Sequence, residues 1–147
     1  MSGGTPPVTH AGAEPSGLAD LLRRLLEGNL AAHPERAALL VPAVVGIHAA
    51  DADVAVTLEL SPAGIVVRDS RPGGVACDLE IVAASADLLS LTASPLVLGL
   101  PDPRTSSGRA VLAKIARGRI RIRGLLRRPA LTTRVARLLS VAVAGHP

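Results

Sequence analysis

The chain of 147 residues contains no phenylalanine, tyrosine or tryptophan, although 48% of its residues are apolar. Its core therefore has to be built from leucine, isoleucine, valine and alanine. The absence of aromatic rings removes the platforms on which single-stranded nucleic acid stacks, and it disfavours flat aromatic ligands. A space inside such a core would have aliphatic walls, which suit an acyl chain or another aliphatic lipid. A filled aliphatic core without a cavity is the alternative that the composition leaves open.

Cysteine and long apolar runs are also scarce. Cys77 is the only cysteine, which excludes an internal disulfide and gives no indication of an oxidising compartment. The N-terminal residues lack the basic start and apolar run of a signal peptide. No segment reaches the roughly 18 apolar residues of a membrane-spanning helix. We therefore expect a cytoplasmic protein, with residues 1–16 as a disordered tail and residues 17–147 as a single domain.

Groups that carry catalysis or bind metals are few and scattered. The four histidines fall in the predicted tails, between helices or at the end of a strand, and no pair has the His-x-x-x-His spacing of a metal site. Cys77 precedes a strand and is better explained as a small buried apolar residue than as a nucleophile. The sequence therefore predicts a protein that is not an enzyme and that holds no metal or cofactor.

Acidic residues are absent from the last 45 positions, which contain eleven arginines or lysines, whereas the first 102 contain five basic and twelve acidic residues. The predicted basic surface comprises Arg117, Arg119, Arg121, Arg123, Arg127, Arg128, Arg134 and Arg137. The favoured interpretation is a solvated face that balances the acidic part of the chain. An anionic membrane surface or a protein partner is the alternative. Nucleic-acid binding is disfavoured because no recognisable module is present. Nothing indicates an oligomeric state.

Apolar periodicity predicts an α+β domain. Helices are expected over residues 18–28, 34–40, 85–94, 106–117 and from 130 onward, and strands over residues 43–48, 54–60, 65–69, 78–81 and 119–123. Short links predict that the first four strands form an antiparallel meander. The long helical link before the fifth strand predicts a right-handed crossover into a parallel pairing with the fourth. Asp78 and Glu80 would then face the arginines of the last strand.

Three stretches in this order resemble the sterol carrier protein 2 domain family. They are the strand pair at residues 53–58 and 64–67, the strand and leucine-rich helix at 77–81 and 85–91, and the basic strand between glycines at 113–124. The resemblance spans about residues 41–143. It implies a five-stranded mixed sheet with helices packed over one face, enclosing an apolar tunnel for lipid. It also implies binding or transfer of an aliphatic lipid, fatty acyl or sterol-like, rather than chemistry.

The predicted tunnel involves the apolar loop at residues 95–103 and the last helix. The loop would form the mouth of the tunnel, or pack down as a lid on the core, and the helix would form one wall, or pack as an ordinary amphipathic helix. The predicted ligand-binding residues are Leu96, Val97, Leu98, Leu100, Leu112, Ile115, Leu131, Val135, Leu138 and Leu139. A module of the same fold with a filled core, acting through the basic C-terminal surface, is the alternative function.

Overall fold

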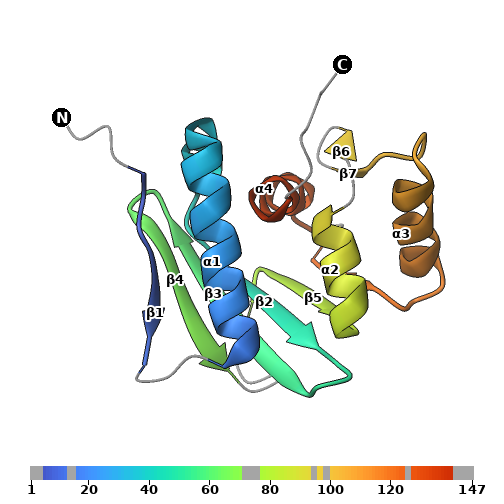
Figure 1. The fold of residues 1–147 in the computed structure, drawn as a ribbon, viewed down its shortest axis with the longest axis horizontal. Coiled ribbons are helices and arrows are strands. Elements are labelled where there is room, and N and C mark those ends of the chain that lie inside the picture. Colours follow the sequence, from blue (N-terminus) through green and yellow to red (C-terminus); the bar gives the residue numbers. More distant parts are fainter. Residues whose placement is uncertain are drawn as a thin grey trace.

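A six-stranded mixed sheet with helices on one face organises the computed structural model, which describes residues 5–12, 16–70, 77–93, 96–97, 100–124 and 127–140 (Figure 1). The strands of this sheet are β1 (Val8–Ala11), β2 (Ala43–Ala49), β3 (Val54–Ser61), β4 (Gly64–Ser70), β5 (Leu79–Ala83) and β8 (Arg121–Arg123), in the order β1-β4-β3-β2-β5-β8. The helices are α1 (Gly17–Ala32), the 3-10 helix η1 (Pro34–Leu39), α2 (Ser85–Ala93), α3 (Ser106–Ala116) and α4 (Pro129–Leu139). A separate two-stranded ribbon consists of β6 (Leu96–Val97) and β7 (Leu100–Pro101).

The antiparallel meander predicted from the sequence is confirmed for β2, β3 and β4, but it is wrong for β5, which pairs in parallel with β2. Period-2 alternation places Val45, Ile47, Val56, Leu58 and Val67 on the face that the helices cover, and each of these residues is at most 3% exposed. A two-residue turn joins β3 to β4, and the register pairs Ser61 with Gly64. Gly64 has a φ of 148°, and a Cβ there would collide with the carbonyl oxygen of Pro7, so the turn requires glycine.

The predicted parallel pairing of the fourth and fifth strands is wrong, because β8 runs antiparallel to β5. A single crossover helix returns the chain to its starting edge and yields a parallel pair. Here α2 and α3 both intervene, and the second reversal brings the chain into β8 from the opposite end. The predicted charge pairing with the last strand is confirmed for Glu80, whereas Asp78 pairs with Arg128 at the start of α4 instead. Glu80 lies opposite Arg123 with an O–N distance of 3.3 Å, and Asp78 lies 3.3 Å from Arg128.

The prediction of five strands is also wrong, since β1 adds a sixth from the segment that was expected to be a disordered tail. β1 pairs in parallel with β4, and Val8 is 6% exposed within the core. His10 lies 3.0 Å from the carboxylate of Asp69, which also accepts a hydrogen bond from the Ser16 backbone N–H at 3.1 Å. Composition missed this strand because a distant segment holds it in place, and its own apolar content is low.

Helix α1 begins at a side-chain cap and extends one turn beyond the predicted stop at Gly28. The hydroxyl of Ser16 accepts a hydrogen bond from the Ala19 N–H at 3.1 Å. The helix continues to Ala32 because Leu30 is fully buried and the Asn29 amide donates to the carbonyl of Leu138 at 2.8 Å. This burial offsets the roughly 1 kcal/mol by which glycine disfavours a helix interior. Helices α1, α2 and α4 lie over one face of the sheet, and α3 lies beside α2 (Figure 1).

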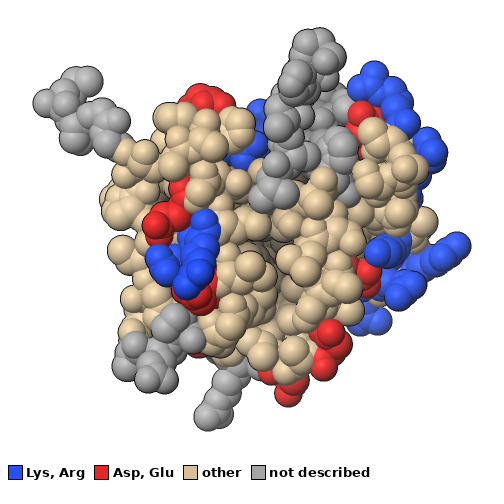
Figure 2. Space-filling model, in the orientation of Figure 1, with Lys and Arg blue, Asp and Glu red and all other residues tan. Residues whose placement is uncertain are grey.

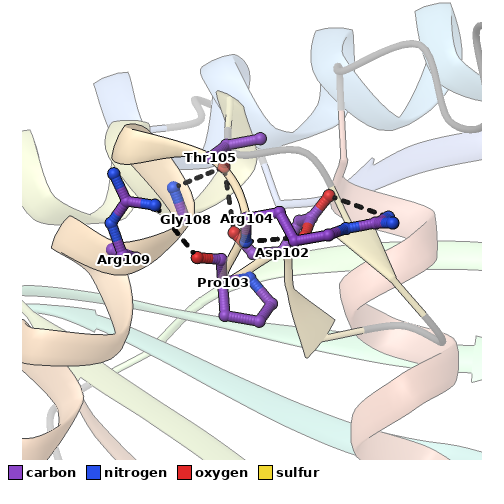
Figure 3. A network of polar contacts seen from close by, with 6 residues as sticks. All are labelled: Asp102, Pro103, Arg104, Thr105, Gly108 and Arg109. Atoms are coloured by element: carbon purple, nitrogen blue, oxygen red, sulfur yellow. Dashed lines mark hydrogen bonds and ion pairs between the residues drawn. The ribbon is translucent and has the colours of Figure 1, made fainter.

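A compact polar network fixes the start of α3 (Figure 3). The hydroxyl of Thr105 donates to the carbonyl of Asp102 at 2.9 Å and accepts from the Gly108 N–H at 3.0 Å. The side chain and backbone N–H of Arg104 both bond the carboxylate of Asp102, and these bonds lower the pKa of that carboxyl. A Cβ on residue 108 would collide with the Asp102 carbonyl, so glycine permits this close approach.

The end of α4 is anchored from two other elements. Asn29 of α1 bonds the Leu138 carbonyl, and Arg36 of η1 donates to the Ser140 carbonyl at 2.7 Å. Burial lowers the pKa of Arg36. These bonds satisfy carbonyls that have no partner within their own helix. None of the helices in the described ranges combines the length and hydropathy needed to cross a membrane.

Candidate functional site

An apolar cavity of about 360 Å³ lies between α1, α2 and the helix-covered face of the sheet. In Figure 2 this face of the molecule is hollowed near its centre, and the surface immediately around the hollow carries no charged side chain. The described residues that line it are Gly17, Leu18, Leu21, Leu22, Leu25, Ile47, Ala49, Ala52, Val54, Ile81, Ser85, Leu88, Leu89, Leu91, Thr92 and Leu139. The walls therefore come from both helices, from β2, β3 and β5, and from the end of α4.

The lining offers an aliphatic surface with few polar groups. Ser85 and Thr92 are its two polar side chains among the described residues. The Ser85 hydroxyl donates to the carboxylate of Asp51 at 2.9 Å, and the Thr92 hydroxyl donates to the Leu89 carbonyl at 2.8 Å. Because both hydroxyl hydrogens already have acceptors, an aliphatic guest would leave no lining donor unsatisfied.

Two exposed leucines mark the mouth of the cavity. Leu21 of α1 is 44% exposed and Leu89 of α2 is 52% exposed, and they are the exposed large apolar side chains of the described residues. Both belong to the cavity lining. Exposed large apolar side chains that meet at one opening are typical of a binding site for an apolar ligand. The mouth therefore lies between α1 and α2.

Small residues and the lack of rings explain why space remains here. Gly17, Ala49 and Ala52 contribute little volume to the lining, and its largest side chains are leucine and isoleucine. Aromatic side chains, which bury 150–250 Å² each and often fill such spaces, are absent from the whole sequence. The composition thus predicted the aliphatic character of the cavity walls, but it left open whether a cavity exists and where it would lie.

Polar contacts at two points hold α2 over the cavity. At its first residue, the backbone N–H and the hydroxyl of Ser85 donate to Asp51 at 2.8 and 2.9 Å, and these bonds lower the pKa of Asp51. In its first turn, Asp87 lies 2.7 Å from the Nζ of Lys114 in α3. The side chain of Asp87 is 7% exposed and that of Lys114 is 26% exposed. The wall formed by α2 is therefore held at its first residue by the turn between β2 and β3, and in its first turn by α3.

The ten predicted ligand-binding residues fall in different places. Leu139 lines the cavity. Leu131, Val135 and Leu138 are 2–3% exposed and belong to the main core cluster, where α4 packs on the sheet and α1. Leu112 and Ile115 are half-buried on α3, and Ile115 packs against a second cluster of Ala83, Val111 and Ile120.

The predicted lid falls largely outside the described side chains. Leu96, Val97 and Leu100 contribute backbone to the β6–β7 ribbon, and Leu98 lies outside the described residues. The role of the loop at residues 95–103 as a mouth or lid stays a prediction.

Sequence reasoning missed the leucines of α1 and α2, which are seven of the sixteen described lining residues. The signal was present in α1, where Leu21 lies outside the stripe formed by Leu22 and Leu26. Leu22 and Leu26 are 6% and 1% exposed, whereas Leu21 remains accessible. A leucine in excess of the core stripe indicates a second apolar surface on the same helix.

The predicted basic surface divides into paired and unpaired arginines. Arg123 and Arg128 pair with Glu80 and Asp78, and Arg134 donates to the carbonyls of Ala38 and Leu39. The remaining five are exposed and form no ion pair with another described residue, namely Arg117, Arg119, Arg121, Arg127 and Arg137. The acidic part of the chain therefore neutralises some of these arginines by ion pairing and leaves the others without an acidic partner among the described residues.

Comparison with known proteins identifies the fold. A solved structure of the ubiquinone synthesis protein UbiJ, a sterol carrier protein 2 domain, superposes with a TM-score of 0.56 and 14% identity, over 83% of this chain and 92% of that one. A conserved hypothetical protein of Thermus thermophilus, proposed as a sterol carrier protein, matches with a TM-score of 0.43 and 16% identity, over 93% and 96% of the two chains. No protein-family model and no curated protein matches the sequence. The chain has a sterol carrier protein 2-like fold, which confirms the resemblance found in the sequence.

Proposed function

We propose that the protein binds an aliphatic lipid, fatty acyl or sterol-like, in the cavity between α1 and α2, and that it carries out no reaction on it. The cavity is the observation that carries this proposal. Its volume of about 360 Å³ falls within the range of about 300–1,000 Å³ that is usual for ligand sites. Its described lining is uncharged and almost wholly aliphatic. The similarity in fold to a sterol carrier protein 2 domain supports a lipid as the ligand class.

Transfer of apolar surface from water supplies the driving force. Each buried methylene contributes about 0.8 kcal/mol, so a chain of about ten methylenes gains about 8 kcal/mol. Association itself costs at least about 4 kcal/mol. Affinity should therefore rise about fourfold for each added methylene until the cavity is full. A ligand held in this way needs no specific polar contact.

The first test is a matched pair of cavity and core variants, read by displacement of a fluorescent fatty acid. Ala49 and Ala43 both lie in β2 on the helix-covered face and are 2% and 7% exposed, but only Ala49 lines the cavity. Ala49→Leu places a larger side chain in the open space and should weaken probe binding at least about tenfold, with little loss of stability. Ala43→Leu overpacks the core and should lower the free energy of unfolding by about 1–3 kcal/mol while the folded protein still binds the probe.

Two results would argue against lipid binding. One is unchanged probe affinity in Ala49→Leu, because the probe would then lie elsewhere. The other is an affinity that does not change with acyl chain length, since burial in the cavity requires such a dependence. Mass spectrometry of lipids that co-purify with the wild-type protein would identify the ligand class directly.

A further inference from the structure

The acidic groups nearest to α3 and β8 are already engaged by basic partners. The four ion pairs are Asp78–Arg128, Glu80–Arg123, Asp87–Lys114 and Asp102–Arg104. Arg117, Arg119, Arg121 and Arg127 are exposed, and none of them forms an ion pair or side-chain hydrogen bond with another described residue. We name these four residues the arginine ridge. Its four positive charges therefore have no carboxylate of another described residue within ion-pair distance.

The backbone holds part of the ridge in a fixed arrangement. Ile120 is 1% exposed and Ile122 is half-buried, whereas Arg121 between them is exposed and projects outward. β8 begins at Arg121, and Arg119 lies in the bend just before it, where its backbone N–H donates to the Lys114 carbonyl at 2.9 Å. Gly118 and Gly124, with φ values of 76° and 95°, form the turns at the two ends of the segment 119–123. Lys and Arg side chains gather along the side of the molecule that carries α3 (Figure 2).

The chemistry of the ridge selects among anionic partners. The chain has no aromatic side chain on which nucleic-acid bases could stack, which disfavours single-stranded nucleic acid as the partner. The binding hot spots of specific protein interfaces are enriched in tryptophan and tyrosine as well as arginine, and this chain has neither aromatic residue. The exposed large apolar residues of the described chain are Leu21 and Leu89, on α1 and α2 at the cavity mouth rather than on α3 or β8. An anionic bilayer requires only clustered positive charge.

We propose that the arginine ridge docks the protein onto anionic lipid bilayers. The interaction is electrostatic, without insertion, and therefore reversible and sensitive to salt. Each arginine near such a surface strengthens binding about fivefold, so the four together provide a weak but measurable affinity. This surface lies outside the cavity, and its binding to a bilayer does not require the cavity to be occupied.

Sedimentation with lipid vesicles tests the proposal on the full chain. Vesicles of phosphatidylcholine with about one-third phosphatidylglycerol should retain the wild-type protein at about 0.05 M salt and release it at about 0.5 M. Vesicles of phosphatidylcholine alone should not retain it. The triple variant Arg117→Gln, Arg119→Gln and Arg121→Gln should lose at least about tenfold in affinity for the anionic vesicles.

A second triple variant, Arg23→Gln, Arg24→Gln and Arg68→Gln, is the matched control. It lowers the net charge of the protein by the same three units, but on α1 and β4 rather than on the arginine ridge. It should retain binding within about threefold of the wild type. Equal loss in both variants, equal binding to neutral vesicles, or tighter binding to duplex DNA at the same salt would each overturn the proposal. Far-ultraviolet circular dichroism, measured in parallel, shows that the variants are folded. Absence of fatty-acid probe binding by the wild-type protein, with its vesicle binding intact, would refute the cavity proposal alone.

Discussion

At the scale of single residues, Asp51 has the most direct effect on the site. It lies in the turn between β2 and β3, where its carboxylate accepts two hydrogen bonds from Ser85, the first residue of α2. These bonds lower the pKa of Asp51 below its ordinary value of 3.8. The negative charge of the carboxylate strengthens both hydrogen bonds, and these bonds fix the position of the first residue of α2 above the sheet.

Acidification should release this contact. Because the pKa of Asp51 is lower in the folded than in the unfolded protein, the contribution to stability is present above about pH 4 and is lost as the pH falls through the folded value. Asp51→Ala should therefore lower the melting temperature near neutral pH, with a deficit that shrinks below about pH 3. Asp53→Asn, two residues on, serves as the control, because Asp53 is 86% exposed and asparagine tolerates its left-handed backbone φ of 51°. Equal deficits in the two variants would show that the Ser85 contact is not responsible.

At the scale of elements, α2 is both a wall of the cavity and the link between the two apolar clusters. Leu88 and Leu91 are partly buried and pack against the main cluster and against the smaller cluster of Ala83, Val111 and Ile120. The Asp87–Lys114 ion pair joins α2 to α3 on the side away from the cavity. A helix that borders a cavity makes fewer packing contacts, so ion pairs and hydrogen bonds contribute a larger share of its local stability.

Breaking this ion pair should loosen α2. Asp87→Asn leaves the partly buried ammonium of Lys114 without its anion and should lower the free energy of unfolding by about 1–2 kcal/mol. It should also speed release of a bound fatty-acid probe, as measured by stopped-flow dilution. Glu27→Gln breaks the Arg23–Glu27 pair, in which the glutamate is 54% exposed, and should cost less than about 0.5 kcal/mol. If both substitutions have the same effect, α2 is not fastened by Lys114.

At the scale of the whole molecule, the sheet joins segments that are far apart in the sequence. β1 forms one edge from residues near the N-terminus, and β8 forms the other from the basic C-terminal third. The Glu80–Arg123 and Asp78–Arg128 pairs connect the acidic and basic parts of the chain at the second edge. Cross-strand pairs of this kind contribute about 0.2–1 kcal/mol each, so they align the edge more than they stabilise the fold.

The contribution of β1 can be measured with neighbouring substitutions. Val8 is 6% exposed in the core and Thr9 is exposed. Val8→Ala removes two buried carbon atoms and should lower the free energy of unfolding by about 1.5 kcal/mol, whereas Thr9→Ala should change it by no more than about 0.5 kcal/mol. Urea denaturation of both variants provides the comparison. If Val8→Ala leaves the free energy of unfolding unchanged, β1 pairs with the sheet without contributing to the hydrophobic core.

Local patterns were sufficient for much of the architecture. The alternation in residues 54–60 and 65–69 and the short turn between them specify a hairpin, because both signals depend on neighbouring residues. The leucine spacing of α1 specifies a helix in the same way, although its end depended on contacts of Asn29 and Leu30 that the spacing does not contain. The candidate site was predicted least well. Of the ten predicted ligand-binding residues, the described lining of the cavity includes just Leu139.

The sequence by itself determined that any interior space would be aliphatic, because a chain without rings can build only such walls. It also determined that positive charge would gather in the last third. Only the tertiary structure decided where the space lies, which leucines enclose it, how β8 is directed and which arginines lack an acidic partner. Periodicity reports which side of an element is apolar, but the partner opposite that side comes from a distant part of the chain.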